Sequence, residues 1–473
     1  MDTANQLSRV PTELVAELRS IVGRAHLREG EAVKALDPGE DGANLKAGIV
    51  VAPATTNEVA AVLALCNQNR VPVVPQGGRT GLVGGSVSRP GEIVLSLRRM
   101  TRIERLDPIE RVAVVEAGVT LEALQQDAIR HRLEPGIDIP SRGTATIGGM
   151  ISTNAGGIMA FRNGVMRHRV FGIEAVLVDG TVYSDMTRVV KNAAGYDLKH
   201  LFVGSEGTLG VVTRVVLKLE PVPLATATAL FGLPSVAAVL DVIRLAMDAP
   251  VGELRAAEAL WRSFLDLTAA AWNWSDQSLK RTAPVFLLLS LGGRRESELR
   301  ASFEAIFETA FDRYPDMTGV IAMSGRQETE LWRLREDTDA IYRRYPGAPS
   351  FDVSLPQSEI ARYVESVVAR LATLDPAFEP YVFGHLADGN LHIVLDRAGP
   401  LNAETNARVE AILYRDIVGA GGSFSAEHGI GSKRLGPMAA LGGGGKLRLM
   451  VAMKRFLDPN GILNPGKVVP ATG

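Results

Sequence analysis

Residues 71–85 read Val-Pro-Val-Val-Pro-Gln-Gly-Gly-Arg-Thr-Gly-Leu-Val-Gly-Gly, an apolar run that opens directly into a glycine-rich loop. A second apolar run, 49–51, precedes a stretch of helical periodicity from about 57 to 69, which Thr56 can cap. The order strand, helix, strand predicts a β-α-β unit that ends in the loop. Glycine costs chain entropy, so the loop needs a purpose, and close approach of backbone N–H groups to a phosphate group supplies one.

The glycine loop matches neither of the common nucleotide-binding fingerprints. Its spacing differs from G-x-G-x-x-G, and Gly445-Lys446 is followed by Leu447 rather than by Ser or Thr. Two further glycine-dense stretches, 144–157 and 192–210, carry hydroxyl and amide side chains. Either stretch alone could be a set of simple turns. Three such stretches in one domain favour a large flat ligand packed against backbone.

Three of the seven histidines fall in two short glycine-turned segments. His385 and His392 flank Asp388-Gly389-Asn390, a turn sequence that lets the two imidazoles converge, and Glu427 stands beside His428. Two imidazoles and one carboxylate can hold a divalent metal such as zinc and leave room for a substrate oxygen. The alternative is that these are hydrogen-bonded loop histidines, as a lone histidine usually is.

The bulk composition limits the function classes. A chain of 473 residues with 46% hydrophobic residues suggests two or three domains with large cores. The 51 basic and 53 acidic residues give a net charge of -2, with no electrostatic footprint for nucleic acid and no polybasic run for a lipid surface. The N-terminus lacks signal-peptide features and no apolar run reaches ~20 residues. We expect a cytoplasmic enzyme, with peripheral membrane attachment left open, and a homo-oligomer.

The single cysteine, Cys66, excludes an intrachain disulfide framework. It lies in helical step with Val59, Val62 and Leu63, which predicts a buried small hydrophobe rather than a reactive thiol.

Further local patterns continue to residue 223. Strands are expected over 92–97, 112–119 and 209–219, with a helix capped by Thr120 and a hairpin turn at Asp179-Gly180. At Glu220-Pro-Val-Pro223 the character changes, and we place a domain boundary there. From 224 to about 425 the patterns are mainly helical, as over 240–247, 296–310 and 358–374. All four tryptophans lie in this part and are expected to pack in its core, and the run Gly442–Gly445 is expected to be a loop.

Six motifs occur in a fixed order: the loop 77–85 and the segments 135–157, 195–210, 385–392, 425–431 and 464–467. In that order they resemble the FAD-linked D-2-hydroxyacid dehydrogenase family, which includes D-lactate dehydrogenase, D-2-hydroxyglutarate dehydrogenase and the flavin subunit of glycolate oxidase. The resemblance implies an α+β fold of the vanillyl-alcohol-oxidase type. Residues 1–221 would form a two-lobed FAD-binding domain; within it, the helical spacing of Leu14, Leu18, Ile21 and Val22 by itself predicts a helical lead-in over 1–48. Residues 222–425 would form an α+β cap domain with an antiparallel sheet, and 426–473 would return to the flavin.

The resemblance also implies a set of cofactor residues. Those matching the family's motifs are Pro75, Gln76, Gly77, Gly78, Arg79, Thr80, Gly81, Gly84, Gly85, Pro135, Gly136, Asp138, Thr144, Gly148, Gly149, Asn154, Gly156, Gly157, Glu206, Gly207, Gly210, Val211 and Asn464. Some flavoproteins of this fold attach FAD through a histidine of the glycine loop. Arg79 and Thr80 stand there instead, so we expect non-covalent FAD.

The chemistry that the resemblance implies is oxidation of a D-2-hydroxy acid to the 2-oxo acid, with flavin N5 as hydride acceptor. His385, His392 and Glu427 would hold the metal, Zn²⁺ in the first place and Mn²⁺ as the alternative. His428 would be the general base, and Arg335 would pair with the substrate carboxylate unless it is a solvated helix residue. Electrons would pass on to an electron-transfer flavoprotein, a quinone or a cytochrome.

The chain departs from the family pattern at the side-chain pocket. Ser350 stands where relatives acting on 2-hydroxyglutarate have a lysine, Asp339 where a small polar contact is expected, and Val394 where an amide is usual. We therefore expect a monocarboxylic substrate to be preferred. Two other functions stay open: a non-redox FAD enzyme of the alkylglycerone-phosphate synthase type, and the flavin subunit of a multi-subunit glycolate oxidase.

Overall fold

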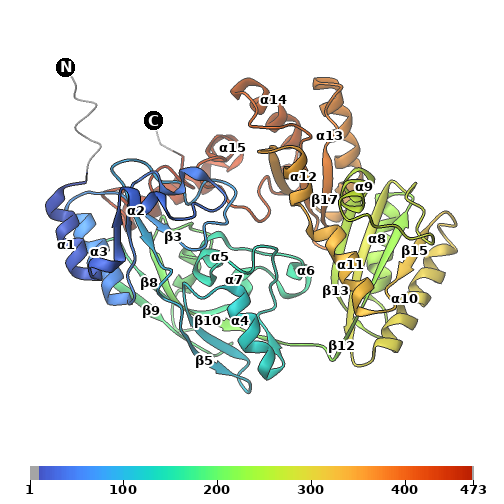
Figure 1. Ribbon diagram of the computed structural model, residues 1–473, viewed down its shortest axis with the longest axis horizontal. Helices are drawn as coiled ribbons and strands as arrows, with labels where there is room; N and C mark the ends of the chain where they lie inside the picture. Colours follow the sequence, from blue (N-terminus) through green and yellow to red (C-terminus); the bar gives the residue numbers. More distant parts are fainter. Residues whose placement is uncertain (1–9, 471–473) are drawn as a thin grey trace. The chain divides into compact units, whose positions relative to one another are not determined.

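The computed structural model describes residues 10–470, and the chain divides into two compact units (Figure 1). Of the described residues, unit 1 contains 10–156, Asn163–Val222 and 427–470, whereas unit 2 contains Gly157–Arg162 and Pro223–Ala426. The short excursion Gly157–Arg162 was not anticipated from the sequence.

The first lobe of unit 1 is a mixed sheet with strand order β1-β2-β4-β3. Its elements are β1 (Leu27–Glu29), β2 (Ile49–Val51), β3 (Val73–Gln76) and β4 (Ile93–Ser96), with α1 (Thr12–Val22), α2 (Glu31–Lys34) and α3 (Thr56–Gln68). β2 and β3 both pair in parallel with β4, which lies between them, so the predicted β-α-β crossover is confirmed. Two details differ: Thr55 rather than Thr56 caps α3, and the lead-in contains the strand β1.

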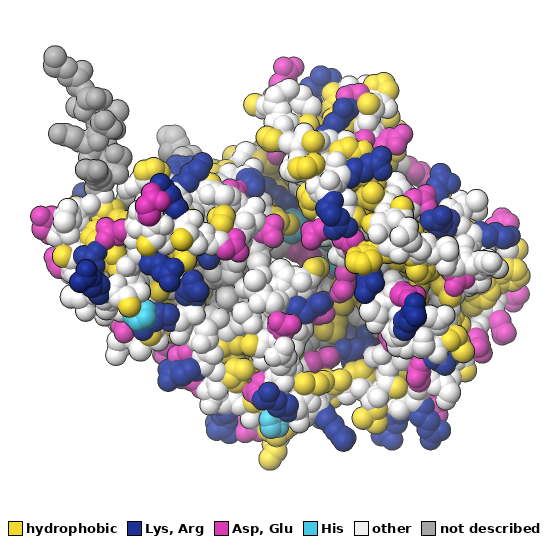
Figure 2. Space-filling view, in the orientation of Figure 1, with side chains coloured by type: hydrophobic (Ala, Val, Ile, Leu, Met, Phe, Trp, Pro, Cys, Tyr) yellow, Lys and Arg dark blue, Asp and Glu magenta, His cyan; other side chains and the backbone are white. Residues whose placement is uncertain are grey.

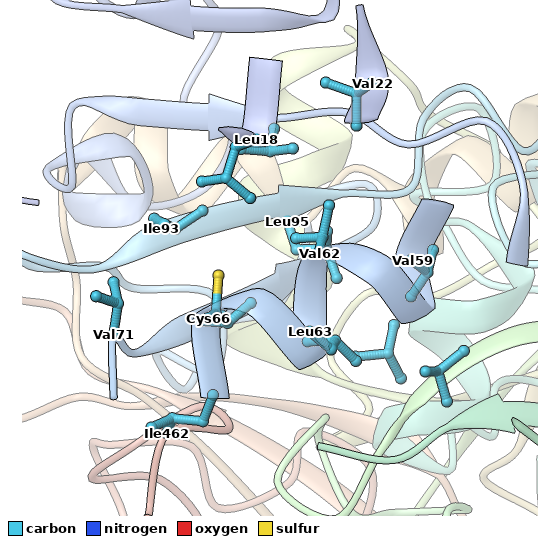
Figure 3. Packing of buried hydrophobic residues seen from close by; sticks show 14 of the residues in the cluster. Leu18, Val22, Val59, Val62, Leu63, Cys66, Val71, Ile93, Leu95 and Ile462 are labelled. Atoms are coloured by element: carbon cyan, nitrogen blue, oxygen red, sulfur yellow. The ribbon is translucent and has the colours of Figure 1, made fainter. Parts of the chain in front are cut away.

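Helix α3 packs its apolar side against this sheet, beside α1 (Figure 3). Cys66 is fully buried there among Val62, Ile93 and Leu95, as its helical spacing predicts. Burial raises the pKa of the Cys66 thiol to about 12. Ile462 joins the same core from the last segment of the chain, and its carbonyl accepts a hydrogen bond from the Val73 amide at 2.8 Å.

The second lobe of unit 1 is a five-stranded antiparallel sheet with order β5-β6-β10-β8-β9. Its strands are β5 (Ile103–Asp107), β6 (Val112–Glu116), β8 (Val170–Val176), β9 (Val182–Asp185) and β10 (Val211–Lys218). The Asp179-Gly180 turn joins β8 to β9, and Thr120 caps α4, as predicted. Other elements of unit 1 are α4 (Leu121–Ala128), β7 (Leu133–Glu134), α5 (Ile147–Thr153), α7 (Met166–Arg169), β11 (Glu220–Pro221), α15 (Leu435–Leu441) and α16 (Gly444–Leu457), and α6 (Ala160–Asn163) crosses the division.

Unit 2 is built on a seven-stranded, wholly antiparallel sheet with order β15-β12-β14-β13-β17-β18-β16. Its strands are β12 (Ala225–Leu233), β13 (Glu253–Trp261), β14 (Val285–Gly293), β15 (Thr318–Ile321), β16 (Ser350–Ser354), β17 (Tyr381–His385) and β18 (Asn390–Val394). Its helices are α8 (Val236–Met247), α9 (Arg262–Ala271), α10 (Glu296–Phe311), α11 (Gly325–Glu336), α12 (Asp339–Arg344), α13 (Ile360–Leu374) and α14 (Ala403–Leu413).

Helices cover both faces of the unit 2 sheet. Consecutive residues of a strand point to opposite faces. Leu230 accordingly packs with residues of α9, α11 and α12, whereas the next residue, Phe231, packs its ring on Phe303 of α10 with centroids 6.2 Å apart. The antiparallel sheet of an α+β unit is therefore confirmed.

Two local expectations in the second half of the chain are wrong. The core position expected of the tryptophans is wrong for Trp272, which is 45% exposed, whereas Trp274 and Trp332 are half-buried and pack against the apolar cluster. Trp272 instead donates to Asp337 at 2.9 Å, under the guanidinium of Arg333. The glycine run is also no simple loop, because α16 begins within it.

The surface carries charges of both signs. On the face seen in Figure 2, basic and acidic side chains are interspersed over each unit. Within the described range 10–470, no helix combines the length and the apolar character needed to cross a bilayer.

Candidate active site

A hairpin in unit 2 brings the two histidines together. β17 and β18 pair so that Phe383 lies directly opposite His392 and His385 lies opposite Asn390. His385 and His392 are therefore diagonal neighbours on one face of the sheet, a spacing at which side chains interact. Their ring centroids lie 5.4 Å apart with the rings nearly perpendicular, and their candidate ligand atoms lie within 4.8 Å. The turn predicted from the sequence thus places both imidazoles as expected.

Glycine makes this hairpin possible at two positions. Gly389, in the turn, has φ +81°, and a Cβ there would meet the Leu355 carbonyl oxygen at 2.0 Å. A Cβ on Gly384 would meet the carbonyl oxygen of Asn390, on the paired strand, at 2.2 Å. The backbone of the histidine hairpin can therefore approach its neighbours only where side chains are missing.

His385 is held by a carboxylate that the sequence did not reveal. Glu258 of β13 lies opposite His385 in the sheet and is 0% exposed. Its Oε1 lies 2.7 Å from His385 Nδ1, and its Oε2 lies 2.7 Å from Arg335 Nε. Burial by itself raises the pKa of the Glu258 carboxyl, but the positive charges of His385 and Arg335 outweigh it, so that pKa lies below its usual range.

His392 also stands beside a buried carboxylate. Asp352 of β16 lies opposite His392 and is 0% exposed, and its Oδ1 lies 3.8 Å from His392 Nδ1. Asp352 accepts further hydrogen bonds from the Asn390 side chain at 2.7 Å and the Ala426 amide at 3.0 Å. Because Glu258 lies within hydrogen-bond distance of His385 Nδ1, Nε2 is the ring atom that His385 can present to a metal, an arrangement typical of metal-binding histidines. The two histidines therefore fit a divalent metal.

Arg335 is positioned on the same face of the sheet. It lies in the last turn of α11, is 5% exposed, and places its guanidinium 5.0 Å from the Phe383 ring centroid. Glu258 holds it at Nε, and among the described residues none accepts a hydrogen bond from its two terminal nitrogens. Those nitrogens can pair with a carboxylate in the bidentate manner that suits a guanidinium. Arg335 is therefore no solvated helix residue.

Glu427 and His428 begin the last segment of unit 1, directly after Ala426. In unit 1 the following turn is fixed by Glu206, which accepts hydrogen bonds from the amides of Ile430 at 2.8 Å and Gly431 at 3.0 Å. Burial raises the pKa of Glu206, although these amide hydrogen bonds oppose the rise. Glu206, predicted as a cofactor residue, thus also holds the segment that carries His428.

The glycine loop of unit 1 packs closely on the second glycine-dense stretch. A Cβ on Gly77 would meet Thr146 Oγ1 at 2.2 Å, and one on Gly78 would meet the Thr144 carbonyl oxygen at 2.0 Å. In the last segment, a Cβ on Gly431 would meet the Val83 carbonyl oxygen at 2.2 Å. Three segments far apart in the sequence therefore approach one another closely at glycines, as a cradle for a large flat ligand requires.

Two predicted cofactor residues carry buried acceptor atoms that have no hydrogen-bond partner among the described residues. Gln76 donates to the carbonyls of Asn44 and Ser86, and Asn464 donates to those of Gly85 and Glu206. The remaining side-chain oxygens, Gln76 Oε1 and Asn464 Oδ1, are buried and accept no hydrogen bond from any described residue. Buried acceptors are rarely left unpaired, so these oxygens fit a ligand with donor groups, such as a flavin or its adenosine part.

Four other predicted cofactor residues differ in how their side chains or backbone could reach a ligand. Asp138 is engaged by Arg142 at 2.7 and 2.8 Å, and the Asn154 carboxamide oxygen accepts from the Arg167 amide at 2.9 Å. Val211 is buried in the core of the first lobe, so only its backbone could face a cofactor. Gly157 lies in the excursion that belongs to unit 2. Their contacts with FAD remain predictions.

Sequence reasoning missed Glu258 and Asp352. Each interrupts a short apolar run within its strand, Glu258 in Ala-Ala-Glu-Ala-Leu and Asp352 in Phe-Asp-Val. A lone carboxylate inside a buried strand needs a partner, and this is the one local pattern that could have identified both.

Comparison with known proteins places the chain in a family. Residues 222–468 match the model of the C-terminal domain of FAD linked oxidases, and residues 47–185 match an FAD binding domain. D-2-hydroxyglutarate dehydrogenase of Xanthomonas citri pv. viticola is 35% identical over 423 residues, covering 89% of this chain and 88% of that protein. The mitochondrial D-2-hydroxyglutarate dehydrogenase of Bos taurus is 34% identical, covering 89% and 77%. A putative mitochondrial D-lactate dehydrogenase of Schizosaccharomyces pombe is 30% identical, covering 96% and 90%.

Solved structures share the fold at low sequence identity. A 4-ethylphenol oxidase from Gulosibacter chungangensis superposes with a TM-score of 0.74 at 21% identity and covers 98% of both chains. An alkyldihydroxyacetonephosphate synthase superposes with a TM-score of 0.72 at 15% identity, covering 97% of this chain and 85% of that one. The vanillyl-alcohol-oxidase type of fold is thereby confirmed. With the family models and these relatives, the chain belongs to the family of FAD-linked D-2-hydroxyacid dehydrogenases, oxidoreductases that act on a CH–OH group.

Proposed function

We propose that this protein oxidises a D-2-hydroxy acid to the 2-oxo acid with non-covalently bound FAD and a divalent metal held by His385, His392 and Glu427. The observation that carries the proposal is the polar end of the unit 2 sheet. There the buried Glu258 lies 2.7 Å from His385 Nδ1, and the buried Asp352 lies 3.8 Å from His392 Nδ1. Arg335 pairs with Glu258 on the same face. A metal ligand pair next to a carboxylate receptor suits a substrate whose hydroxyl and carboxylate are on adjacent carbons.

The roles of the chain's own residues follow from their chemistry. The terminal nitrogens of Arg335 would bind the substrate carboxylate, which orients the 2-carbon. A bound divalent metal supplies a Lewis acid that lowers the pKa of the hydroxyl. His428 would take the hydroxyl proton on its imidazole, a common role of histidine in general acid–base catalysis. FAD, when bound, supplies the two-electron acceptor.

Chain connectivity supports the assignment of Glu427 and His428. Ala426, the last residue of unit 2, donates its amide to Asp352, and Asp352 lies directly opposite His392. Glu427 and His428 are the next two residues, so the segment that carries them leaves unit 2 beside the histidine face. Under this proposal unit 1 binds FAD, unit 2 is the substrate domain, and the last segment joins them.

A dye-linked dehydrogenase assay tests the function. Purified protein would be given D- and L-2-hydroxy acids with Zn²⁺ or Mn²⁺ and an artificial electron acceptor. We expect turnover of D- but not L-enantiomers, and bleaching of the flavin by the D-acid when no acceptor is present. Bound FAD that no D-2-hydroxy acid bleaches would contradict the proposal and favour a non-redox enzyme of the same fold. The natural acceptor, whether an electron-transfer flavoprotein, a quinone or a cytochrome, can be compared in the same assay.

The metal site is tested by His392→Ala. We expect loss of bound metal and at least a hundredfold loss of kcat/KM together, while the FAD content is unchanged, because the glycine cradle lies in unit 1. Metal content by elemental analysis and flavin absorbance measure the two effects. His131→Ala is the matched control, since His131 is an exposed histidine of unit 1. Loss of flavin with retention of metal would show that the assignment is wrong.

A further inference from the structure

Glu258 is a fully buried side chain on the histidine face, and it contacts two functional groups at once. Its Oε1 meets His385 and its Oε2 meets Arg335, each at 2.7 Å. We propose that Glu258 is a positioning residue that links metal binding at His385 to substrate-carboxylate binding at Arg335. The inference rests on the proposed function of His385 and Arg335, and it assigns to Glu258 a separate role, the coupling of their two binding functions.

The strand register makes the double contact possible. Glu258 on β13 lies directly opposite His385 on β17, so its side chain points to the same face as the imidazole. Arg335 reaches the same carboxylate from α11, which covers that face. The two oxygens are thus divided between two elements, and neither contact can shift without moving the other.

Each contact sets the geometry of the functional end of its partner. A carboxylate at Nδ1 fixes the imidazole orientation, raises its basicity, and leaves Nε2 as the ligand atom. The ion pair at Nε restrains the Arg335 guanidinium and leaves its two terminal nitrogens for a substrate carboxylate. Either effect alone would be a structural contact. Together they mean that Glu258 aligns both the metal-ligand atom of His385 and the guanidinium of Arg335 that binds the substrate carboxylate.

Charge gives Glu258 a second effect on both groups. A buried guanidinium and a divalent metal in one neighbourhood repel each other, and a low local dielectric strengthens this repulsion. The negative charge of Glu258, which is 0% exposed, lies between Arg335 and His385, where it compensates the guanidinium and would compensate a metal bound at His385. Glu258→Gln keeps the shape and removes the charge, so it should weaken metal binding and substrate binding in the same protein.

The test measures both affinities in the FAD-loaded full chain. Metal-free protein is titrated with Co²⁺ and followed by its visible absorption, and KM and kcat are then measured with the best D-2-hydroxy acid at saturating metal. For Glu258→Gln we expect Co²⁺ affinity to fall by about 10- to 100-fold, the usual effect of losing such a partner. We expect KM to rise at least tenfold and by a larger factor than kcat falls, because Arg335 acts in binding.

A matched control separates this role from the general effect of neutralising a buried acid. Glu116→Gln removes another strand carboxylate, 1% exposed and paired with Arg102 at 2.7 Å, in unit 1. We expect it to leave Co²⁺ affinity and KM within about twofold of wild type. If Glu258→Gln does not fold, Glu258→Asp decides. It keeps the charge but is too short to reach both partners, so at least one of the two affinities should fall tenfold.

The outcomes distinguish this inference from the proposed function. Wild-type protein that binds no Co²⁺ and oxidises no D-2-hydroxy acid would overturn both. Wild-type protein that does both, with Glu258 variants that retain Co²⁺ affinity and KM within twofold, would overturn the inference alone. Loss of Co²⁺ affinity with an unchanged KM would reduce Glu258 to an orienting partner of His385 and would also contradict the link.

Discussion

At the scale of single residues, buried carboxylates organise the functional groups of each unit. In unit 2, Glu258 and Asp352 face the two histidines, and in unit 1 Glu206 holds the turn after His428. A buried charge is tolerated only with partners, and removing one partner of such a pair costs about 3–5 kcal/mol. These buried acids therefore hold the functional side chains, or the segments that carry them, in defined positions.

The thiol of Cys66 should be inert in the folded protein. Its pKa is raised to about 12 by burial, so at pH 8 the thiol is protonated, whereas only the thiolate is a nucleophile. We expect iodoacetamide to leave the native protein unmodified at pH 8 and to label one cysteine per chain after unfolding in guanidinium chloride, as mass spectrometry would show. Stoichiometric labelling of protein with an unchanged circular dichroism spectrum would contradict this.

The substrate pocket should favour a monocarboxylic acid. Ser350 lies opposite Val394, which is buried in the apolar cluster, and Asp339 is exposed at the start of α12. Arg335 is the one buried lysine or arginine among the described residues of unit 2. A second substrate carboxylate would find no equivalent partner, and an unpaired buried carboxylate costs several kcal/mol.

Side-by-side kinetics measure this preference. We expect kcat/KM for D-lactate, or for a longer monocarboxylic D-2-hydroxy acid, to exceed that for D-2-hydroxyglutarate by at least tenfold. Two arginines of α12, near Ser350 in the chain, are already engaged: Arg343 pairs with Asp337 at 2.6 Å, and Arg344 lies over the Tyr345 ring. A clear preference for D-2-hydroxyglutarate would mean that a group elsewhere grips the distal carboxylate.

At the scale of elements, the hairpin β17–β18 is the structure that makes two ordinary histidines into a pair. Its turn depends on Gly389, where φ is +81° and the Leu355 carbonyl oxygen lies 2.0 Å from the position of a Cβ. The Gly389 carbonyl also accepts a hydrogen bond from the Leu355 amide at 3.0 Å. Turn geometry and the contact with the residue that follows β16 therefore depend on the same glycine.

Gly389→Ala should disturb both the hairpin and the metal site. Positive φ alone costs about 1–3 kcal/mol for an alanine, and the clash with Leu355 adds to that cost. We expect a lower free energy of unfolding by urea and at least a tenfold loss of Co²⁺ affinity. Gly399→Ala is the control, because Gly399 has φ +76° and a Cβ placed there would have no neighbour within 4 Å. It should lose stability from strain alone and keep its metal affinity. Equal metal affinity in both variants would contradict the argument.

At the scale of the whole molecule, unit 1 assembles its cradle from segments that are far apart in the chain. The loop 77–85, the stretch from Thr144 to Gly149, Glu206 and the final segment with Asn464 contact one another. None of the loop residues 75–85 is a histidine, cysteine or tyrosine, the side chains that could bond to a flavin. Binding should therefore depend on the folded assembly and not on a covalent link.

The expected result is a yellow protein that releases its FAD when it unfolds. After precipitation with trichloroacetic acid, the flavin should appear in the supernatant, and the pellet should be colourless. Absorbance at the flavin maximum measures the two fractions. Flavin that remained with the polypeptide would show a covalent attachment outside the glycine loop.

The sequence by itself determined the features that depend on near neighbours in the chain. The crossover through α3, the Thr120 cap, the Asp179-Gly180 hairpin and the histidine hairpin were all predicted, because turns, caps and short periodicities are local. The ordered motifs also predicted the α+β fold and the FAD-linked family, since both depend on which residue types recur in which order.

Tertiary structure decided which groups hold the site. Glu258 is 127 residues from His385, and Arg335 belongs to a separate helix, so their contact depends on the strand order of the sheet and on which helix covers it. Asp352 meets His392 for the same reason, through the pairing of β16 with β18. The residue that faces a histidine from a neighbouring strand cannot be identified from the pattern of its own segment. Which residues face each other is decided by which strands pair and which faces are buried. The types of chemical group were thus evident from the sequence, whereas their mutual alignment came from the packing of the sheet.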